Sequence, residues 1–378
     1  MASVTGAKKR IRVLPLYKGS NKRSIRSLMK TLDLFRASKL PVPASTAWYL
    51  ETLGEFRGKQ ELFTRQSPQK LRVLREHALI ESAVSSNRIE GVSVEPSRLE
   101  SVLIATKPLF RDRDEEEVRG YRDALGWIHG HSSEITFGED TLKRMHAVAR
   151  GQIWDAGQYK EKDGDIIERY ADGRERVRFR PTPASETAVA MTQLMETWNQ
   201  CAREKWVPRP VALAAFNLDF LCIHPFRDGN GRVSRLALLL QSYQAGMEVG
   251  RYVSLERLIE QNKDRYYETL EQCSIHWHEG KHDPWPFINY MLNILKDAYR
   301  EFEERVGQIA EPKGAKAELV RSAVRKRSGE FRLSDIERAC PGVGRDWVRV
   351  VLAEMKKEGE LECKGRGMAA RWSVRLKL

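Results

Sequence analysis

The chain has 378 residues, of which 41% are hydrophobic and 31% are charged, and its formal net charge is +13. This balance is typical of a soluble globular protein with two or three domains. No run of about 18 apolar residues occurs, and the basic N-terminal segment has no apolar stretch of the kind a signal peptide needs. The five cysteines form no CxxC pair. They therefore favour reduced thiols and a cytoplasmic location over a disulfide framework or a zinc site.

Helical periodicity dominates the sequence, so a mainly α fold is expected. Residues 1–45 are a basic lead-in with one short helix expected near residues 24–37, and residues 46–110 are expected to form N-terminal helices. A long central domain is expected over residues 111–306. Its helices are expected at residues 115–130, 138–150, 184–204, 210–223, 231–245, 255–277 and 284–306.

One segment inside the central domain breaks the helical pattern. Residues 157–183 are polar and strand-like, and Asp172-Gly173 is a favoured pair for a tight hairpin turn. Pro181 and Pro183 end the segment. The sequence therefore predicts a β-hairpin inserted into a helical body, with an ordinary surface hairpin as the alternative to a functional one.

A small C-terminal domain is expected at residues 316–378, after a linker at residues 307–315. Its expected elements are three helices followed by a hairpin, which is the order of a winged helix. Residues 312–378 carry 17 Lys and Arg against 9 Asp and Glu, a net charge of +8. A basic third helix and hairpin fit contact with DNA phosphates. A protein-binding or dimer module is the equal alternative.

The segment His224–Arg235 is the most informative part of the sequence. An apolar helix precedes it and must stop before Pro225, which lacks an N–H group. Gly229 and Gly231 permit positive φ angles, so the loop can turn several backbone N–H groups toward one centre. A second apolar helix begins at about Gly231, and the free N–H groups of its first turn favour an anion.

The charged residues of this segment add specific chemistry. Arg232 and Arg235 are three residues apart and share a helix face, so both guanidinium groups can bind phosphates. Asp228 beside a phosphate site is sensible mainly if Mg²⁺ bridges the two. His224 titrates near neutral pH and suits a general base. Together they predict phosphoryl or nucleotidyl transfer, and a structural glycine-rich turn is the alternative.

This segment resembles the signature of the Fic family, HxFx(D/E)GNGRxxR. All its fixed positions match, namely His224, Phe226, Asp228, Gly229, Asn230, Gly231, Arg232 and Arg235. The resemblance covers about residues 62–306. It implies a helical Fic core with a β-hairpin flap, ATP with Mg²⁺, and transfer of AMP to a Ser, Thr or Tyr hydroxyl of a target protein. A Fic domain without catalytic activity is the alternative.

The same resemblance implies roles for the matching residues. His224 would deprotonate the target hydroxyl for attack on the α-phosphate, and Asp228 would hold Mg²⁺. The residues that would bind the phosphates are Gly229, Asn230, Gly231, Arg232 and, for the γ-phosphate, Arg235. The glycine at position 231 differs from the phosphorylating branch of the family, which usually has lysine there.

Two other segments resemble parts of a Fic site. The hairpin resembles the flap that holds a target's backbone by strand addition. Four of its residues would then lie over the nucleotide, namely Glu175, Arg176, Val177 and Arg178. Tyr266, followed by Tyr267, resembles a tyrosine pair near the family's adenine pocket, and a core aromatic pair is the equal alternative.

A further match lies upstream, where Ser86-Asn-Arg-Ile-Glu90-Gly91 resembles the inhibitory motif (S/T)xxxE(G/N). The spacing puts Ser86 and Glu90 on one face of a helix that Gly91 ends. In the family such a glutamate pairs with the second signature arginine, here Arg235, and competes with the γ-phosphate. Glu90 is therefore expected to restrain AMP transfer.

The expected activity is protein adenylyl transfer restrained by Glu90. The alternatives are a DNA-binding regulator that uses its Fic domain as a nucleotide sensor, and an enzyme that removes AMP with the same site. The expected partners are ATP and a target protein. DNA bound through residues 316–378 and a second copy of the chain are further candidates, and no membrane partner is expected.

Overall fold

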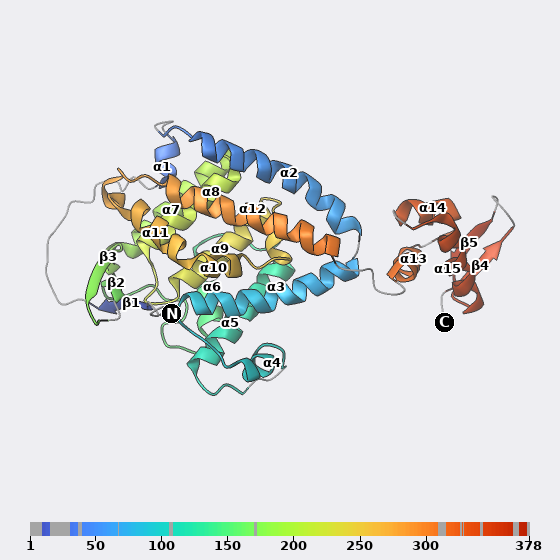
Figure 1. Cartoon of the computed structure of the whole chain (residues 1–378), viewed down its shortest axis with the longest axis horizontal. Helices are drawn as coiled ribbons and strands as arrows, with labels where there is room; N and C mark the ends of the chain where they lie inside the picture. The colour runs from blue at the N-terminus through green and yellow to red at the C-terminus, as the bar shows by residue number, and fades with distance from the viewer. Residues whose placement is uncertain are drawn as a thin grey trace, which may run out of the picture. The chain divides into compact units, whose positions relative to one another are not determined.

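The computed structural model of the chain describes residues 10–15, 31–36, 40–66, 68–105, 109–169, 172–308, 315–325, 327, 329–340, 343–365 and 370–375. The described part is mainly helical with two small antiparallel sheets (Figure 1). It divides into two compact units, and each is considered by itself. The first comprises residues 1–60 and 74–302, and the second residues 61–73 and 303–378. No helix in the described ranges is long and apolar enough to cross a membrane.

The helices of the first part of the chain follow the expected order. They are α1 (Thr31–Arg36), α2 (Ala44–Gln66), α3 (Pro68–Ile89), α4 (Leu99–Leu103), α5 (Arg113–His131), α6 (Glu139–Arg150), α7 (Ala184–Glu204), α8 (Arg209–Ile223), α9 (Asn230–Gln244), α10 (Leu255–Gln261), α11 (Lys263–Ser274) and α12 (Trp285–Gln308).

Helices α8 and α9 form the centre of this unit. Every residue of α8 from Val211 to Ile223 is buried, and so is every residue of α9 from Arg232 to Tyr243. Helices that are buried on every side belong in a core, and α1, α5, α6 and α7 pack around this pair. The short loop between α8 and α9 is therefore held at both ends by buried helices.

A buried carboxylate ties the N-terminal helix α1 to this core. The Asp219 side chain on α8 accepts hydrogen bonds from the Thr31 backbone N–H (3.0 Å), the Thr31 hydroxyl (2.6 Å) and the Trp277 indole N–H (2.8 Å). A fully buried charge needs such donors to offset its loss of water. Asp219 therefore fixes both α1 and the turn at Trp277 against α8.

The predicted hairpin is present as β2 (Gly164–Arg169) and β3 (Glu175–Phe179), which pair antiparallel. A third strand, β1 (Arg10–Pro15), pairs antiparallel with the other edge of β2, so the sheet order is β1-β2-β3. Residues 10–15 belong to the basic lead-in, for which the sequence predicts a short helix but no strand. The short helix expected near residues 24–37 is α1, and residues 24–30 and 37 lie outside the described ranges.

The prediction of a single helix at residues 255–277 is wrong, because the structure has two helices there, α10 and α11, which are separated at Asn262. The side-chain amide of Asn262 donates to the Leu258 carbonyl at 3.1 Å, and its backbone leaves the helical region (φ −116°, ψ 32°). Asparagine competes with helical hydrogen bonding in this way. The break makes α11 a separate helix, and α11 lines the site described below.

The C-terminal elements appear in the expected order. They are α13 (Ala315–Arg325), α14 (Leu333–Ala339), α15 (Arg345–Lys357), β4 (Leu361–Lys364) and β5 (Arg371–Val374). The buried faces of the three helices share one small core with Phe331, Cys340 and Leu361. Phe331 also pairs with Trp372 through two backbone hydrogen bonds, so a third extended segment joins the hairpin.

Candidate active site

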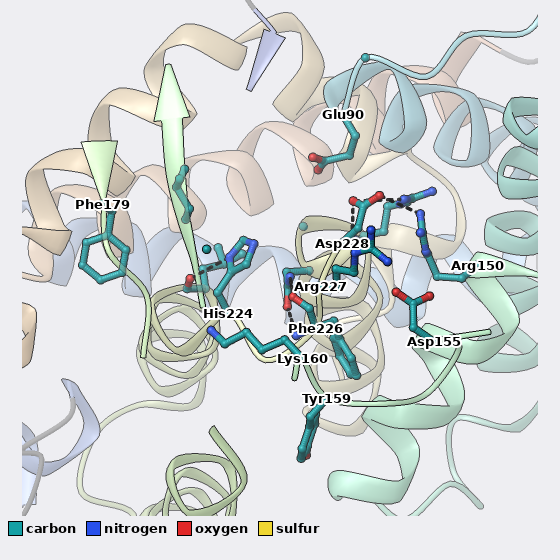
Figure 2. Close-up of a pocket in the computed structure, with 18 of the residues that line it drawn as sticks. Glu90, Arg150, Asp155, Tyr159, Lys160, Phe179, His224, Phe226, Arg227 and Asp228 are labelled. Carbon is teal, nitrogen blue, oxygen red and sulfur yellow. Dashed lines mark hydrogen bonds and ion pairs between the residues drawn. The ribbon is translucent and has the colours of Figure 1, made fainter. Parts of the chain in front are cut away.

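The cavity considered as the site lies at the loop between α8 and α9 and has a volume of about 1150 Å³. Its walls come from the end of α3, from α5 and α6, from the segment leading into β2, and from α11. Figure 2 shows His224 beside Lys160 on one side of the cavity, and Asp228, Arg150 and Glu90 on the other. The sequence motif at residues 224–235 and the inhibitory-like motif at residues 86–91 thus meet at one cavity.

The loop is held in shape from both within and outside. The Asn230 side chain accepts from the Phe226 N–H (2.9 Å) and donates to the Phe226 carbonyl (2.7 Å). The His146 ring of α6 stacks on the Phe226 ring with centroids 3.9 Å apart. Its Nε2 lies 3.0 Å from the Asp228 carbonyl, and its Nδ1 accepts from the Gly157 N–H at 2.8 Å. Asn230 therefore uses its amide to shape the loop, and only its backbone N–H remains for an anion.

His224 stands at the rim of the cavity as a neutral imidazole. It caps α8 in the left-handed region (φ 52°), a conformation that few non-glycine residues adopt. Burial and the nearby Lys160 ammonium lower the pKa of His224 to about 4. Its Nδ1 lies 3.3 Å from the Leu221 carbonyl and donates to it, which leaves the Nε2 lone pair free. The geometry therefore offers an unprotonated base at neutral pH.

Lys160 precedes the hairpin and locks its first residues to the end of α8. Its backbone N–H donates to the Pro225 carbonyl (2.8 Å), and its ammonium donates to the Ile223 carbonyl (3.1 Å). Burial lowers the pKa of Lys160 to about 8. The residue thus brings positive charge next to His224 and fastens the hairpin to the loop.

The start of α9 faces the cavity with its backbone. Gly229 adopts a positive φ of 79° as the N-cap, and Gly229, Asn230, Gly231 and Arg232 all line the cavity. The first N–H groups of a helix have no partner within it and carry partial positive charge. This end of α9 is therefore suited to bind an anion.

Asp228 presents its carboxylate to the cavity, with its side chain 57% exposed. Its Oδ2 pairs with Arg150 at 2.9 Å, and its Oδ1 accepts from the Gly229 N–H at 2.6 Å. Burial acts to raise the pKa of Asp228, but Arg150 and Arg232 outweigh it and the pKa lies below its usual range. Asp228 is therefore an ionised carboxylate beside the anion-binding end of α9.

Behind Asp228, the buried carboxylate of Glu117 on α5 gathers three arginines. It pairs with Arg232 at 2.7 Å, with Arg113 at 2.9 Å and with Arg150. The side chains of Glu117, Arg150 and Arg232 are nearly fully buried, so these three groups are desolvated and fixed, whereas Arg113 is half exposed. Glu117 thus sets the position of the two arginines, Arg150 and Arg232, that flank Asp228.

Glu90 at the end of α3 reaches across to Arg235. Its Oε1 lies 2.8 Å from Arg235 Nη2, and the same guanidinium donates to the Ser86 hydroxyl and the Ser86 carbonyl, both at 2.9 Å. Gly91 ends the helix at a positive φ of 84°. Arg235 is only 2% exposed and is not among the residues that line the cavity, whereas Glu90 lines it. The carboxylate therefore covers the guanidinium on the cavity side.

The glycine at position 231 makes room for this carboxylate. A Cβ atom built on Gly231 would lie 2.2 Å from Glu90 Oε1, a distance at which something must shift. Glu90 thus lies directly against the first turn of α9, where the helix end favours negative charge. The carboxylate occupies space at the same helix end that an anionic ligand would use.

The hairpin residues expected over a nucleotide divide into two groups. Arg178 lines the cavity and pairs with Glu271 of α11 at 2.6 Å. Arg176 pairs with the same carboxylate at 2.7 Å and with Glu168 at 3.1 Å. Glu175, Arg176 and Val177 are not among the residues that line the cavity. Glu271 therefore fastens the hairpin to α11, with Arg178 as its contact at the cavity.

Tyr266 and Tyr267 of α11 both line the cavity, with their rings edge to face at 5.2 Å. Tyr266 is buried, and burial raises its pKa to about 12. The Tyr267 hydroxyl lies 3.4 Å from the Ile89 carbonyl at the end of α3. The pair is thus part of the cavity wall as well as of the packing between α3 and α11.

Five residues of this site were missed from the sequence, namely His146, Glu117, Arg150, Lys160 and Glu271. A signal existed for Glu117, which shares a helical stripe with the buried Tyr121 and Ala124 at spacings of four and seven residues. For the other four, the neighbouring sequence does not indicate whether the polar side chain points into the protein or into solvent.

Comparison with known proteins agrees with this geometry. Residues 135–242 match the model of the Fic/DOC family, whereas no curated protein matches the chain. A Fic family protein from Desulfovibrio desulfuricans G20 is similar over 89% of this chain and 98% of its own, with a TM-score of 0.57 and 21% identity.

Two further solved structures share the fold. A Fic domain containing signaling protein from Bacteroides thetaiotaomicron VPI-5482 matches 68% of this chain and 98% of its own, with a TM-score of 0.56 and 19% identity. Fic-1 from C. elegans matches 69% of this chain and 74% of its own, with a TM-score of 0.53 and 18% identity. The chain therefore contains a Fic/DOC family domain, which runs from α6 through most of α9 and includes the loop at His224.

Proposed function

We propose that this chain is a protein adenylyltransferase, which transfers AMP from ATP to a Ser, Thr or Tyr hydroxyl of a target protein. Fic domain proteins are generally enzymes of nucleotidyl transfer. The observation that carries the proposal is the neutral His224 at the rim of a cavity whose floor is the N-terminal end of α9. A base and an anion-binding helix end at one cavity fit attack by a hydroxyl on a bound phosphate.

In the proposed transfer, the target's hydroxyl oxygen forms a bond to the α-phosphorus of ATP, and the bond from that phosphorus to the bridging oxygen of the β-phosphate breaks. Pyrophosphate leaves, and the hydroxyl proton passes to Nε2 of His224. The Leu221 carbonyl, which accepts from Nδ1, holds the imidazole in the tautomer that this transfer needs.

Asp228 is the proposed ligand for Mg²⁺. Within the described residues no group of three or more His, Cys, Asp or Glu side chains gathers to hold a metal ion by itself. An ionised, exposed carboxylate beside a phosphate site nevertheless suits Mg²⁺, which commonly uses one or two carboxylates together with substrate phosphates. The ion would neutralise phosphate charge, while Arg150 and the Gly229 N–H keep Asp228 in place.

Glu90 is proposed to restrain the transfer. Its carboxylate pairs with Arg235 and lies against Gly231, so it competes with the γ-phosphate for both the guanidinium and the end of α9. With Arg235 already paired, a triphosphate cannot extend fully along the helix end. The consequence is a low basal rate that loss of the carboxylate raises.

The test uses Glu90→Gly protein, ATP labelled at the α-phosphate, Mg²⁺ and a cell lysate, with mass spectrometry of the labelled proteins. Transfer of α-label that disappears on adding His224→Ala to the same background supports the proposal. Labelling that persists with His224→Ala would reject His224 as the base. Label that comes from the γ-phosphate and not from the α-phosphate would indicate phosphorylation instead.

Removal of AMP by the same site is the second candidate, because Glu90 places a carboxylate inside the cavity where it could orient a water molecule. The two activities respond to Glu90 in opposite directions. Loss of the carboxylate should raise transfer of AMP and lower its removal. Incubating an AMP-modified target with the wild-type chain and with Glu90→Gly protein separates them.

DNA binding through residues 316–378 stays a prediction. The exposed face of α15 carries Arg349, but that guanidinium pairs with Asp346 at 3.3 Å, and Arg345 lies 3.8 Å from Glu337. Trp347 and Val350 are also exposed there, which suits a protein contact as well as DNA. Titration of the full chain with labelled duplex DNA at two salt concentrations tests it, since phosphate contacts weaken steeply with salt.

A further inference from the structure

A second buried polar network lies behind the pair of Glu90 and Arg235, and its centre is Glu256 of α10. The Glu256 side chain accepts from the Ser82 hydroxyl of α3 at 2.7 Å through Oε2, and from the Tyr121 hydroxyl of α5 at 2.9 Å through Oε1. Glu256, Ser82 and Tyr121 are each 1% exposed or less. One carboxylate therefore joins α3, α5 and α10 inside the protein.

The network continues from Tyr121 to Arg235 through Ser86. Ser82 and Ser86 are four residues apart on α3, so they lie on one face of the helix. Burial and the Glu256 charge raise the pKa of Tyr121 well above its ordinary value, whereas the Arg235 charge and a hydrogen bond with Ser86 act to lower it. The Ser86 hydroxyl accepts from Arg235 Nε at 2.9 Å. A continuous run of hydrogen bonds thus links the guanidinium of Arg235 to the carboxylate of Glu256.

Two ion pairs also join α10 to α3. Arg257 Nε lies 3.5 Å from Glu81 Oε2, and Arg88 Nη1 lies 4.0 Å from Glu260 Oε1. All four of these side chains are partly exposed, and such pairs contribute little to a specific arrangement because water and salt screen them. The buried hydrogen bonds of Glu256 are therefore the more specific link between the two helices.

The chemistry of Glu256 favours a role in positioning. A buried carboxylate is costly unless hydrogen-bond donors point at it, and among the described residues hydroxyl groups donate to Glu256. These donors fix the rotation of α3 about its axis and its position along that axis. Glu90 follows Ser86 by one helical turn, so the same contacts fix where the Glu90 carboxylate lies.

We propose that Glu256 is a positioning residue that holds the end of α3 against α9 and thereby keeps Glu90 over Arg235. Its effect on AMP transfer rests on the proposed function and on the proposed restraint by Glu90, but its effect on α3 needs no catalysis. Loss of a hydrogen bond to Glu256 should loosen the end of α3 and weaken the restraint. Such a loss can raise the rate only while Glu90 is present.

The test removes one donor at a time from the full chain, with Ser82→Ala and with Tyr121→Phe. Each substitution deletes a hydroxyl and little else. Ser85→Ala is the matched control for the first, because Ser85 is also buried on α3 but takes no part in these hydrogen bonds. Tyr299→Phe is the control for the second, because the buried Tyr299 hydroxyl donates to Gln60 at 2.9 Å, outside the network. Thermal unfolding checks that each variant stays folded.

Hydrogen–deuterium exchange at the end of α3 is the first measurement, and it needs neither nucleotide nor target. The backbone N–H groups of Glu90, Gly91 and Val92 donate to carbonyls in the last turn of α3, at 2.9 to 3.0 Å, so they report its opening. Exchange there should be about two- to tenfold faster in Ser82→Ala and Tyr121→Phe, the size expected for one lost hydrogen bond. The two controls should exchange like the wild type.

The second measurement is the initial rate of labelling from ATP that carries the label at the α-phosphate. Ser82→Ala and Tyr121→Phe should raise the basal rate about two- to tenfold in the wild-type background. Neither should raise it in the Glu90→Gly background, where no restraint is left to weaken. A substitution that merely disturbs packing would lower the rate in both backgrounds.

Unchanged exchange in both variants, or an equal increase in the controls, would overturn the proposal. A rise in rate that persists in the Glu90→Gly background would also overturn it, because the effect would not pass through Glu90. If no protein is labelled, including Glu90→Gly, the proposed function fails, and the exchange measurement alone then decides whether Glu256 positions α3.

Discussion

Replacement of Glu90 by glycine removes a single carboxylate from the cavity and leaves Arg235 without its partner there. In the wild type the two side chains meet at 2.8 Å, with Arg235 almost fully buried and Glu90 about a quarter exposed. The Ser86 hydroxyl and carbonyl still hold the guanidinium in place after the substitution. The variant therefore opens the proposed phosphate site without removing the arginine that is proposed to bind there.

The size of the effect can be worked from this contact. Two unit charges at 2.8 Å attract by about 6 kcal/mol at an effective dielectric constant of about 20. The loss of water around both groups offsets much of this, so a charged hydrogen bond of this kind contributes about 1.5–3 kcal/mol net. Since about 1.4 kcal/mol corresponds to a factor of ten, Glu90→Gly should raise transfer by about ten- to a hundredfold.

The assay is initial-rate labelling with ATP carrying the label at the α-phosphate. Glu90→Gln tests charge separately from size and should give an intermediate increase. Glu95→Gly is the matched control, because Glu95 pairs with Arg111 at the surface and does not line the cavity. An unchanged rate for Glu90→Gly, or an equal increase for Glu95→Gly, would refute the argument.

Three further predictions concern the surroundings of this contact. A Cβ atom added by Gly231→Ala would meet the Glu90 carboxylate at 2.2 Å, so the substitution should lower the free energy of unfolding. This loss, measured by urea unfolding, should be smaller by about 1 kcal/mol or more in the Glu90→Gly background. Additive effects of the two substitutions would contradict the contact. Lys160→Met removes a positive charge beside His224, so the pKa of His224 should rise from about 4. It should stay below the ordinary value of histidine because the ring is still buried. NMR titration of the ring measures this pKa, and a fall would contradict the prediction. The Lys263 ammonium donates to the last carbonyl of α3. Lys263→Met should therefore loosen the position of Glu90 and raise the basal rate of labelling several-fold. An unchanged rate would show that the end of α3 keeps Glu90 in place without this hydrogen bond.

The loop between α8 and α9 could be predicted because its signals are local. Pro225, the two glycines and the apolar helices on either side lie within one short segment, and each constrains the backbone by itself. The pairing of Glu90 with Arg235 was expected from the resemblance, and the geometry places these side chains in contact. The hairpin was predicted for the same local reason, since Asp172-Gly173 favours a tight turn.

The rest of the site depends on contacts between distant segments. Glu117 and Arg150 lie in ordinary charged helices, and only the packing of α5 and α6 against α9 pairs Arg150 with both Glu117 and Asp228. β1 carried a weak signal, because Ile11 and Val13 alternate with arginines at the period of a strand. A single short strand with no hairpin partner nearby gives no indication of which edge it joins. The helix break at Asn262 was missed because one asparagine is tolerated in most helices.

The end of α9 is proposed to bind a nucleoside triphosphate with its α-phosphate facing His224. A crystal structure of the Glu90→Gly protein with Mg²⁺ and a non-hydrolysable ATP analogue tests it most directly. We expect phosphates along the first turn of α9, the γ-phosphate at Arg235, and the α-phosphate within reach of Nε2 of His224. A nucleotide bound away from residues 224–235, or one whose α-phosphate faces away from His224, would contradict it.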